Sequence, residues 1–182
     1  MYVHYTEINL KTNVQNIAQI RTGLFAKPMK DGQLVYLQAK HFDENGLLRA
    51  NLHADLSPDA VTERHLLKPG EVLFAAKGTK NFATVYEDHN PPAVASTSFF
   101  VLSLLETTVL PQYVAWFLNH PNTQTILKGQ AIGTSIVSIS KAVLESLEIW
   151  IPSVEVQQVV LEITKLRNRE KHLKQQIEVL RE

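Results

Sequence analysis

The last thirty residues of the 182-residue chain carry a heptad pattern, which constrains the fold more than any other feature of the sequence. Eight positions follow one another at spacings of 3,4,3,4,3,4,3, and seven of them are aliphatic. Ser153 precedes the pattern and is suited to cap a helix. The pattern predicts one helix from Val154 to Glu182, about 43 Å long at a rise of ~1.5 Å per residue. The seam positions are Val156, Val159, Ile163, Leu166, Glu170, Leu173, Ile177 and Leu180.

A seam this narrow does not stabilise a lone helix in water, so the helix either packs on its own domain or pairs with another helix. The length and evenness of the heptads favour pairing. Glu170 is costly in a dry interface unless a basic residue reaches it, and it would then select the register or orientation of the pair. The expected helix interface is Val159, Ile163, Leu166, Glu170, Leu173, Ile177 and Leu180.

Composition is that of a globular protein, with 45% apolar and 20% charged residues. The chain has no cysteine, which removes disulfides, thiolate metal sites and cysteine nucleophiles and fits a reducing compartment. No apolar run reaches the roughly 20 residues needed to cross a bilayer, and the N-terminus lacks the apolar stretch of a signal peptide. We therefore expect a cytoplasmic protein without a membrane partner.

The net charge is zero, with 18 basic and 18 acidic side chains. DNA-binding domains usually carry a basic excess, so this balance argues mildly against nucleic acid. Any DNA-binding face must come from local clustering of basic residues. The same balance supports an alternative function, a coiled-coil interaction scaffold whose globular part binds protein and not DNA.

Residues 1–152 mix short β-rich runs with turn signals and short helical stretches, which predicts an α+β domain. A hairpin is expected at Glu44-Asn45-Gly46, between His41-Phe42 and Leu47-Leu48. Pro111 suits the first position of a helix, and Ser140 suits the N-cap of another. The expected strands are 33–39, 71–76, 83–86, 98–105, 133–140 and 147–151, and the expected helices are 111–119, 122–128 and 141–146.

Lysines beside glycine and short polar residues mark candidate DNA contacts. In Lys77–Asn81, two lysines flank a glycine that lets the backbone approach a partner closely, and the polar side chains can bond phosphate or base edges. A solvated hairpin tip is an equally good reading of this segment. The full candidate set is Lys27, Lys30, Lys77, Thr79, Lys80, Asn81, Lys128, Gln130, Thr134 and Ser135.

No residue is expected to be catalytic, and no cofactor or metal is expected. Asn90-Pro91-Pro92-Ala93 is close to the catalytic loop of adenine-amino DNA methyltransferases, but it lacks the aromatic fourth residue that stacks on a flipped base. No glycine-rich loop for a methyl donor is present, and the seven histidines form no closely spaced pair. A proline-stiffened turn between two strands is the better reading of this loop.

The chain resembles the DNA-specificity subunits of type I restriction–modification systems from about Ile17 to Leu166. The strongest match is Gln130–Gln157, where Gly133-Thr134-Ser135, Ser138-Ile139-Ser140, Leu147–Pro152 and then Gln157 follow in family order. Weaker matches are Leu67–Leu73, which looks like the family's Leu-x-x-Gly-Asp-Ile-Leu, and the segments Ala95–Leu102 and Pro111–Leu118. The chain departs from the family at Glu71, where Asp is usual, and at Val156, where Glu is usual.

The resemblance implies that a full subunit holds two target-recognition domains, each reading one half of a split DNA site, joined by long helices that dock methyltransferase subunits. This chain looks like half a subunit, either a natural short form or a fragment, with a recognition domain at 1–152 and a coiled-coil helix at 153–182. The implied partners are double-stranded DNA, a methyltransferase subunit and a second copy of the chain, with a restriction subunit left open. The chain itself would not be an enzyme. A recognition domain from another type of DNA methyltransferase is a further alternative.

Overall fold

A computed structural model describes residues 10–43, 46–78, 80–131 and 137–181. Its centre is a four-stranded antiparallel sheet in the order β2-β8-β4-β6. The strands are β2 (Ala18–Thr22), β8 (Phe99–Leu104), β4 (Val72–Ala75) and β6 (Ala83–Val85). Strands β4 and β8 lie in the middle of this sheet, where their almost wholly apolar sequences are covered on both faces.

The two central strands are buried on both faces because alternate residues enter different cores. Val72, Phe74, Phe100 and Leu102 join a cluster that includes residues of the helices α3 (Pro111–Asn119), α4 (Pro121–Gly129) and α5 (Lys141–Ser146). The residues between them face a second cluster, in which the rings of Phe42, Phe82 and Phe99 pack with centroids 5.2–6.1 Å apart. The middle of the domain is therefore a sheet with a core on each side.

Three two-stranded pairings complete the β structure. Strand β1 (Leu10–Asn13) pairs with β10 (Glu148–Ile151) in an antiparallel ribbon. Strand β3 (Val35–Leu37) pairs in parallel with β7 (Ala93–Ala95). Strand β5 (Lys77–Gly78) pairs with β9 (Val137–Ser138). Short helices α1 (Val14–Ile17), η1 (Ala39–His41) and α2 (Ala60–His65) fill the connections.

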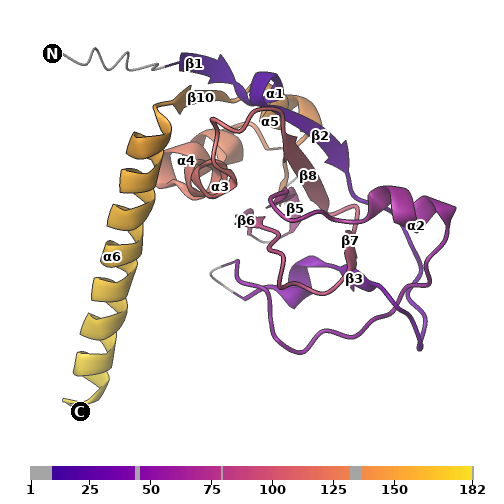
Figure 1. The fold of residues 1–182 in the computed structure, drawn as a ribbon. Helices are drawn as coiled ribbons and strands as arrows, with labels where there is room; N and C mark the ends of the chain where they lie inside the picture. The colour runs from indigo at the N-terminus through magenta and orange to yellow at the C-terminus, as the bar shows by residue number, and fades with distance from the viewer. Residues whose placement is uncertain (1–9, 44–45, 79, 132–136, 182) are drawn as a thin grey trace, which may run out of the picture.

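The last element is the single long helix α6 (Val154–Val179), which starts beside the β1–β10 ribbon and runs along one side of the domain (Figure 1). Only its first turns are anchored: Val160 and Leu161 pack on the core beside α3, and Gln157 is fully buried. The α+β class and the long C-terminal helix are confirmed.

Most elements predicted from sequence are present, with Ser140 capping α5 through a 3.2 Å bond from Val143 N. Glu44 and Asn45 of the predicted hairpin turn lie outside the described residues; on either side of them Phe42 and Leu48 form an antiparallel bridge, and Gly46 has a φ of 77°. Ser153 occupies the N-cap of α6 but makes no side-chain capping bond, and α6 ends three residues before Glu182. The elements that the sequence did not predict are β1, α1, β2, η1, α2, β5 and β7. Of the predicted strand 133–140, residues 137–140 are described, and strand β9 covers the first two of them.

Candidate nucleic-acid interface

The central sheet brings two of the predicted lysine segments to the same end. Antiparallel pairing places Thr22 of β2 opposite Phe100, and Ala75 of β4 opposite Phe99, so β2 and β4 both finish where β8 begins. The loop 23–33 leaves β2 at this point, and the hairpin 76–82 leaves β4. Lys27 and Lys30 lie on the loop and are exposed, and exposed Lys77 and Lys80 lie on the hairpin. We call this edge, made of residues 23–33 and 76–82, the basic end of the sheet.

Backbone hydrogen bonds join both segments to the start of β8. Ser98 O accepts from Ala76 N at 2.8 Å and from Lys77 N at 3.3 Å, while Phe99 O accepts from Gly23 N at 3.0 Å. Two segments that are about fifty residues apart in the chain are thus fixed to neighbouring peptides of one strand.

The hairpin 76–82 is built on backbone geometry that requires glycine. Gly78 has a φ of 142°, a region that L side chains rarely adopt. Ala75 N donates to Phe82 O at 2.8 Å and closes the base of the hairpin. Lys77 and Lys80 therefore both lie on a segment whose base is closed by a backbone hydrogen bond.

Asn81 does not have the expected exposed position. Its side chain is buried, and its amide nitrogen donates a 2.8 Å hydrogen bond to Ala75 O across the base of the hairpin. The amide satisfies a buried backbone carbonyl instead of facing a partner. We assign Asn81 a structural role and remove it from the candidate DNA contacts.

A third predicted segment also reaches the hairpin. Strand β9 pairs with β5, with Lys77 opposite Ser138, and Ile139 N donates to Ala76 O at 2.9 Å. Lys128 and Gln130 are exposed at the C-terminal end of α4, a few residues before β9. The remaining candidates, Thr79, Thr134 and Ser135, lie outside the described residues.

Acidic side chains gather at the opposite end of the sheet. Glu87 and Asp88 follow β6, and Glu106 follows β8, where these strands pair with the first residue of β4 and of β2 respectively. Exceptions to this separation of charge include Lys68, Asp31 on the loop 23–33, and Asp55, whose carbonyl oxygen accepts a hydrogen bond from Met29 N of that loop. A chain of zero net charge thus presents lysines at one end of its central sheet and carboxylates at the other.

The heptad seam of α6 is exposed along its whole length. Its seven aliphatic side chains are between 42% and 85% exposed, whereas the face that carries Gln157, Val160, Leu161 and Thr164 is buried or half-buried. At 100° per residue the two faces lie on nearly opposite sides of the helix. The helix therefore attaches to its own domain through one face and leaves the other, apolar face without a neighbour among the described residues.

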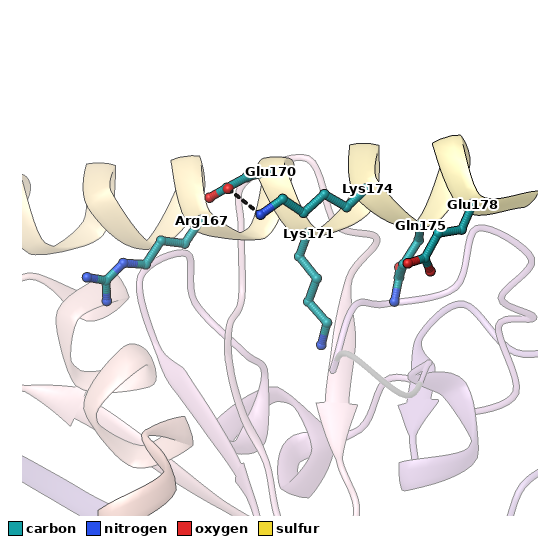
Figure 2. Close-up of a pocket in the computed structure, with 6 residues that line it drawn as sticks. All are labelled: Arg167, Glu170, Lys171, Lys174, Gln175 and Glu178. Atoms are coloured by element: carbon teal, nitrogen blue, oxygen red, sulfur yellow. Dashed lines mark ion pairs between the residues drawn. The ribbon is translucent and has the colours of Figure 1, made fainter.

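Glu170, the acidic seam residue, is paired with Lys174 of the same helix at 2.7 Å (Figure 2). The hydrogen bond from Lys174, its charge and that of Arg167 hold the pKa of Glu170 below its ordinary value. The shallow hollow drawn in Figure 2 is lined by Arg167, Glu170, Lys171, Lys174, Gln175 and Glu178, which all belong to α6. A hollow formed by one helix alone is surface relief and lacks the apolar walls of a ligand pocket.

The Asn90 loop is a turn between β6 and β7, as expected. Asn90 Oδ1 accepts a 2.7 Å bond from Glu87 N, Pro91 O accepts from the Tyr86 hydroxyl, and Pro92 O accepts from Val35 N. These groups are occupied in holding the turn together. In the described part of the chain, no group of three or more His, Cys, Asp or Glu side chains could hold a metal ion. No helix among the described residues is long and apolar enough to span a membrane.

Comparisons with known proteins identify the family and the fold. The type I restriction modification DNA specificity domain family matches residues 57–179. No curated protein matches the chain. The fold is similar to that of the type I restriction–modification S subunit of M. genitalium, with a TM-score of 0.62 and 14% identity. The match covers 98% of this chain and 44% of the M. genitalium chain.

Two further solved structures show the same fold. The HsdS subunit of Thermoanaerobacter tengcongensis superposes with a TM-score of 0.66 at 12% identity, over 96% of this chain and 41% of that one. The third structure comes from a study of complex assembly and conformational transition of the type I restriction–modification system. Its chain superposes with a TM-score of 0.67 at 14% identity, over 96% of this chain and 42% of that one. The chain spans less than half the length of each of these structures. On the family match, which covers about two thirds of its residues, the chain belongs to the type I restriction modification DNA specificity domain family.

Proposed function

We propose that residues 1–152 bind one half of a split DNA site through the basic end of the central sheet. The observation that carries this proposal is the convergence of the loop 23–33, the hairpin 76–82 and β9 at one edge, with four lysines on the first two. Lysines fix a protein on DNA by pairing with phosphates, and short polar side chains nearby can read base edges. The separation of charge along the sheet would let a chain of zero net charge bind DNA.

We further propose that α6 pairs with α6 of a second copy. The seam that is exposed here would then be covered, and each buried aliphatic side chain would contribute about 1.5–3 kcal/mol to association. The solved S subunits are more than twice as long as the part this chain matches. Two copies would therefore supply the two recognition domains that a split site requires.

The position of Glu170 favours antiparallel pairing. In a parallel pair, Glu170 would face Glu170 of the other copy in one layer of the seam, with two carboxylates in apolar surroundings. In an antiparallel pair centred between Leu166 and Glu170, the layers match Val156 with Leu180, Val159 with Ile177, Ile163 with Leu173 and Leu166 with Glu170. Each Glu170 then lies opposite a leucine, within reach of Arg167 or Arg169 of the other copy.

The chain would not carry out methyl transfer or cleavage itself. Methyl transfer would belong to a methyltransferase subunit docked on the helices, as the family resemblance implies, and DNA binding would direct that subunit to its target. A restriction subunit would be a partner of the assembled complex and not of the isolated chain.

An electrophoretic shift with random-sequence duplex at two salt concentrations tests the DNA-binding role. We expect weak binding by the chain that falls steeply as salt rises, because each lysine–phosphate contact releases counterions. Absence of a shift at low salt, from a protein whose circular dichroism shows it to be folded, would leave the coiled-coil scaffold as the better function. In that case the exposed seam of α6 would be the surface that binds a partner protein.

A further inference from the structure

Two large apolar side chains are exposed on the loop 23–33 at the basic end. Phe25 is 74% exposed and Met29 is 49% exposed, with the exposed lysines Lys27 and Lys30 beside them. Single exposed apolar residues are common and need no explanation. This loop differs because it combines an exposed aromatic ring with cations, at the edge of the sheet that already carries Lys77 and Lys80.

The backbone around Phe25 is held by a buried tyrosine. The Tyr36 hydroxyl donates to Leu24 O at 2.9 Å and accepts from Ala26 N at 3.3 Å, so one oxygen clamps the peptides on both sides of Phe25. Tyr36 itself is only 4% exposed. Phe25 therefore projects from a fixed peptide even though its own side chain has little to pack against.

Further contacts hold the loop at both ends. Leu24 N donates to Ala95 O at 2.8 Å, and Met29 N donates to Asp55 O at 2.8 Å. Gly23 passes so close to β7 that a Cβ there would lie 2.1 Å from Ser96 O, so no larger residue fits at this position. A surface loop tied down at three points keeps its shape on binding and loses little conformational entropy.

We infer that Phe25 enters a groove of the bound DNA and contacts bases, while Lys27 and Lys30 pair with the phosphates beside it. A phenyl ring has no hydrogen-bonding groups, so it gains free energy by leaving water against thymine methyl groups or between base pairs. The two lysines beside Phe25 favour a polyanion, and not an apolar protein surface, as the binding partner of this loop. Tyr36 is the positioning residue of this contact. The inference rests on the proposed DNA-binding function and deepens it by naming a residue that recognises bases.

The test compares variants of the full chain on two duplexes, one selected by the wild-type chain from a random library and one unrelated. Phe25→Ala should weaken binding to the selected duplex about tenfold, affect the unrelated duplex less and leave the salt dependence unchanged. Lys27→Ala with Lys30→Ala should weaken both duplexes and lower the salt slope by about two. Phe25→Leu, which keeps an apolar side chain, should restore part of the lost affinity.

Leu105→Ala is the matched control. Leu105 is also exposed, at 60%, but it directly follows β8 at the acidic end of the sheet, about 20 Å along the strand direction from Phe99. The Leu105→Ala variant should bind both duplexes with the affinity of the wild type. Tyr36→Phe removes only the clamping hydroxyl, and it should lower the ratio of selected to unrelated affinity while circular dichroism stays unchanged.

The outcomes separate the inference from the function on which it rests. A wild-type chain that binds no DNA would overturn both. A wild-type chain that binds DNA while Phe25→Ala behaves like Leu105→Ala would overturn the inference alone. Loss of binding to a methyltransferase subunit in Phe25→Ala, with DNA binding intact, would make the loop a protein contact and would also overturn it.

Discussion

The side-chain oxygen of Gln157 accepts a 2.9 Å hydrogen bond from the backbone N–H of Leu110, which ties the start of α6 to the N-cap of α3. The amide nitrogen of the same side chain donates to Thr108 O at 2.8 Å and to Pro152 O at 2.9 Å. One glutamine thus satisfies three backbone groups of two connecting segments. This joint sets the direction in which the long helix leaves the domain.

Gln157→Ala should lower the free energy of unfolding by about 3 kcal/mol, because it leaves buried backbone groups without partners. Urea denaturation followed by circular dichroism measures this change. Gln158→Ala is the control, since Gln158 is the next residue of the same helix and is exposed. Equal stability of the two variants would show that water replaces the Gln157 bonds.

Glu71→Ala should destabilise the domain by about 3 kcal/mol or more, because it leaves the half-buried guanidinium of Arg21 without its carboxylate partner. Glu71 is 6% exposed and accepts hydrogen bonds from Arg21 at 2.7 and 2.9 Å, from Ser103 Oγ at 2.7 Å and from Lys68 N at 2.9 Å. Thermal unfolding should show a larger loss for Glu71→Ala than for Glu87→Ala, which removes a carboxylate outside this network. A melting temperature like that of wild type would contradict the structural role of the pair.

Lys77→Ala with Lys80→Ala should weaken binding to all duplexes and lower the slope of log affinity against log salt by up to about two. Fluorescence anisotropy over a range of salt concentrations measures the slope. Lys11→Ala with Lys68→Ala removes the same charge, from the β1–β10 ribbon and from the turn before β4, and should leave the slope closer to that of wild type. If the two double variants lowered the salt slope equally, the basic end would not be the DNA-binding surface.

Leu166→Ala with Leu173→Ala should shift the protein from dimer to monomer, because both residues lie in the interior of the seam. Sedimentation equilibrium measures the shift. Asn168→Ala with Gln175→Ala is the control, since these neutral residues lie on the helix away from the seam. The leucine variant should bind specific DNA much more weakly than wild type, because the avidity of two linked domains is lost. The folding of residues 1–152 should change far less. A wild-type chain that stays monomeric at tens of micromolar would rule out the homodimer.

Cysteine cross-linking should distinguish the two orientations, since the natural chain contains no cysteine to interfere. In the antiparallel register, chains with Ile163→Cys and chains with Leu173→Cys should form a disulfide with each other when mixed. Ile163→Cys alone should remain largely uncross-linked, because its neighbour across the seam is Leu173. Efficient self-cross-linking of Ile163→Cys would instead indicate a parallel pair and would leave Glu170 facing its own copy.

The local patterns of the sequence predicted much of the fold because they depend on near neighbours in the chain. The heptads predicted α6, and the apolar runs predicted β4 and β8 as strands. The segments that were missed, β2 and β7 among them, are short and derive their stability from strands far away in sequence. For such segments, long-range pairing outweighs the weak local preference.

The sequence by itself determined the long helix with its apolar seam, the α+β class and the zero net charge. Only the tertiary structure decided where the charges lie, because antiparallel pairing of β2, β8 and β4 carries two distant lysine segments to one edge and carboxylates to the other. It also buried Asn81 and exposed Phe25, two outcomes that residue type does not predict. Burial depends on which segments fold over a side chain, and that is a property of the whole chain and not of its local sequence.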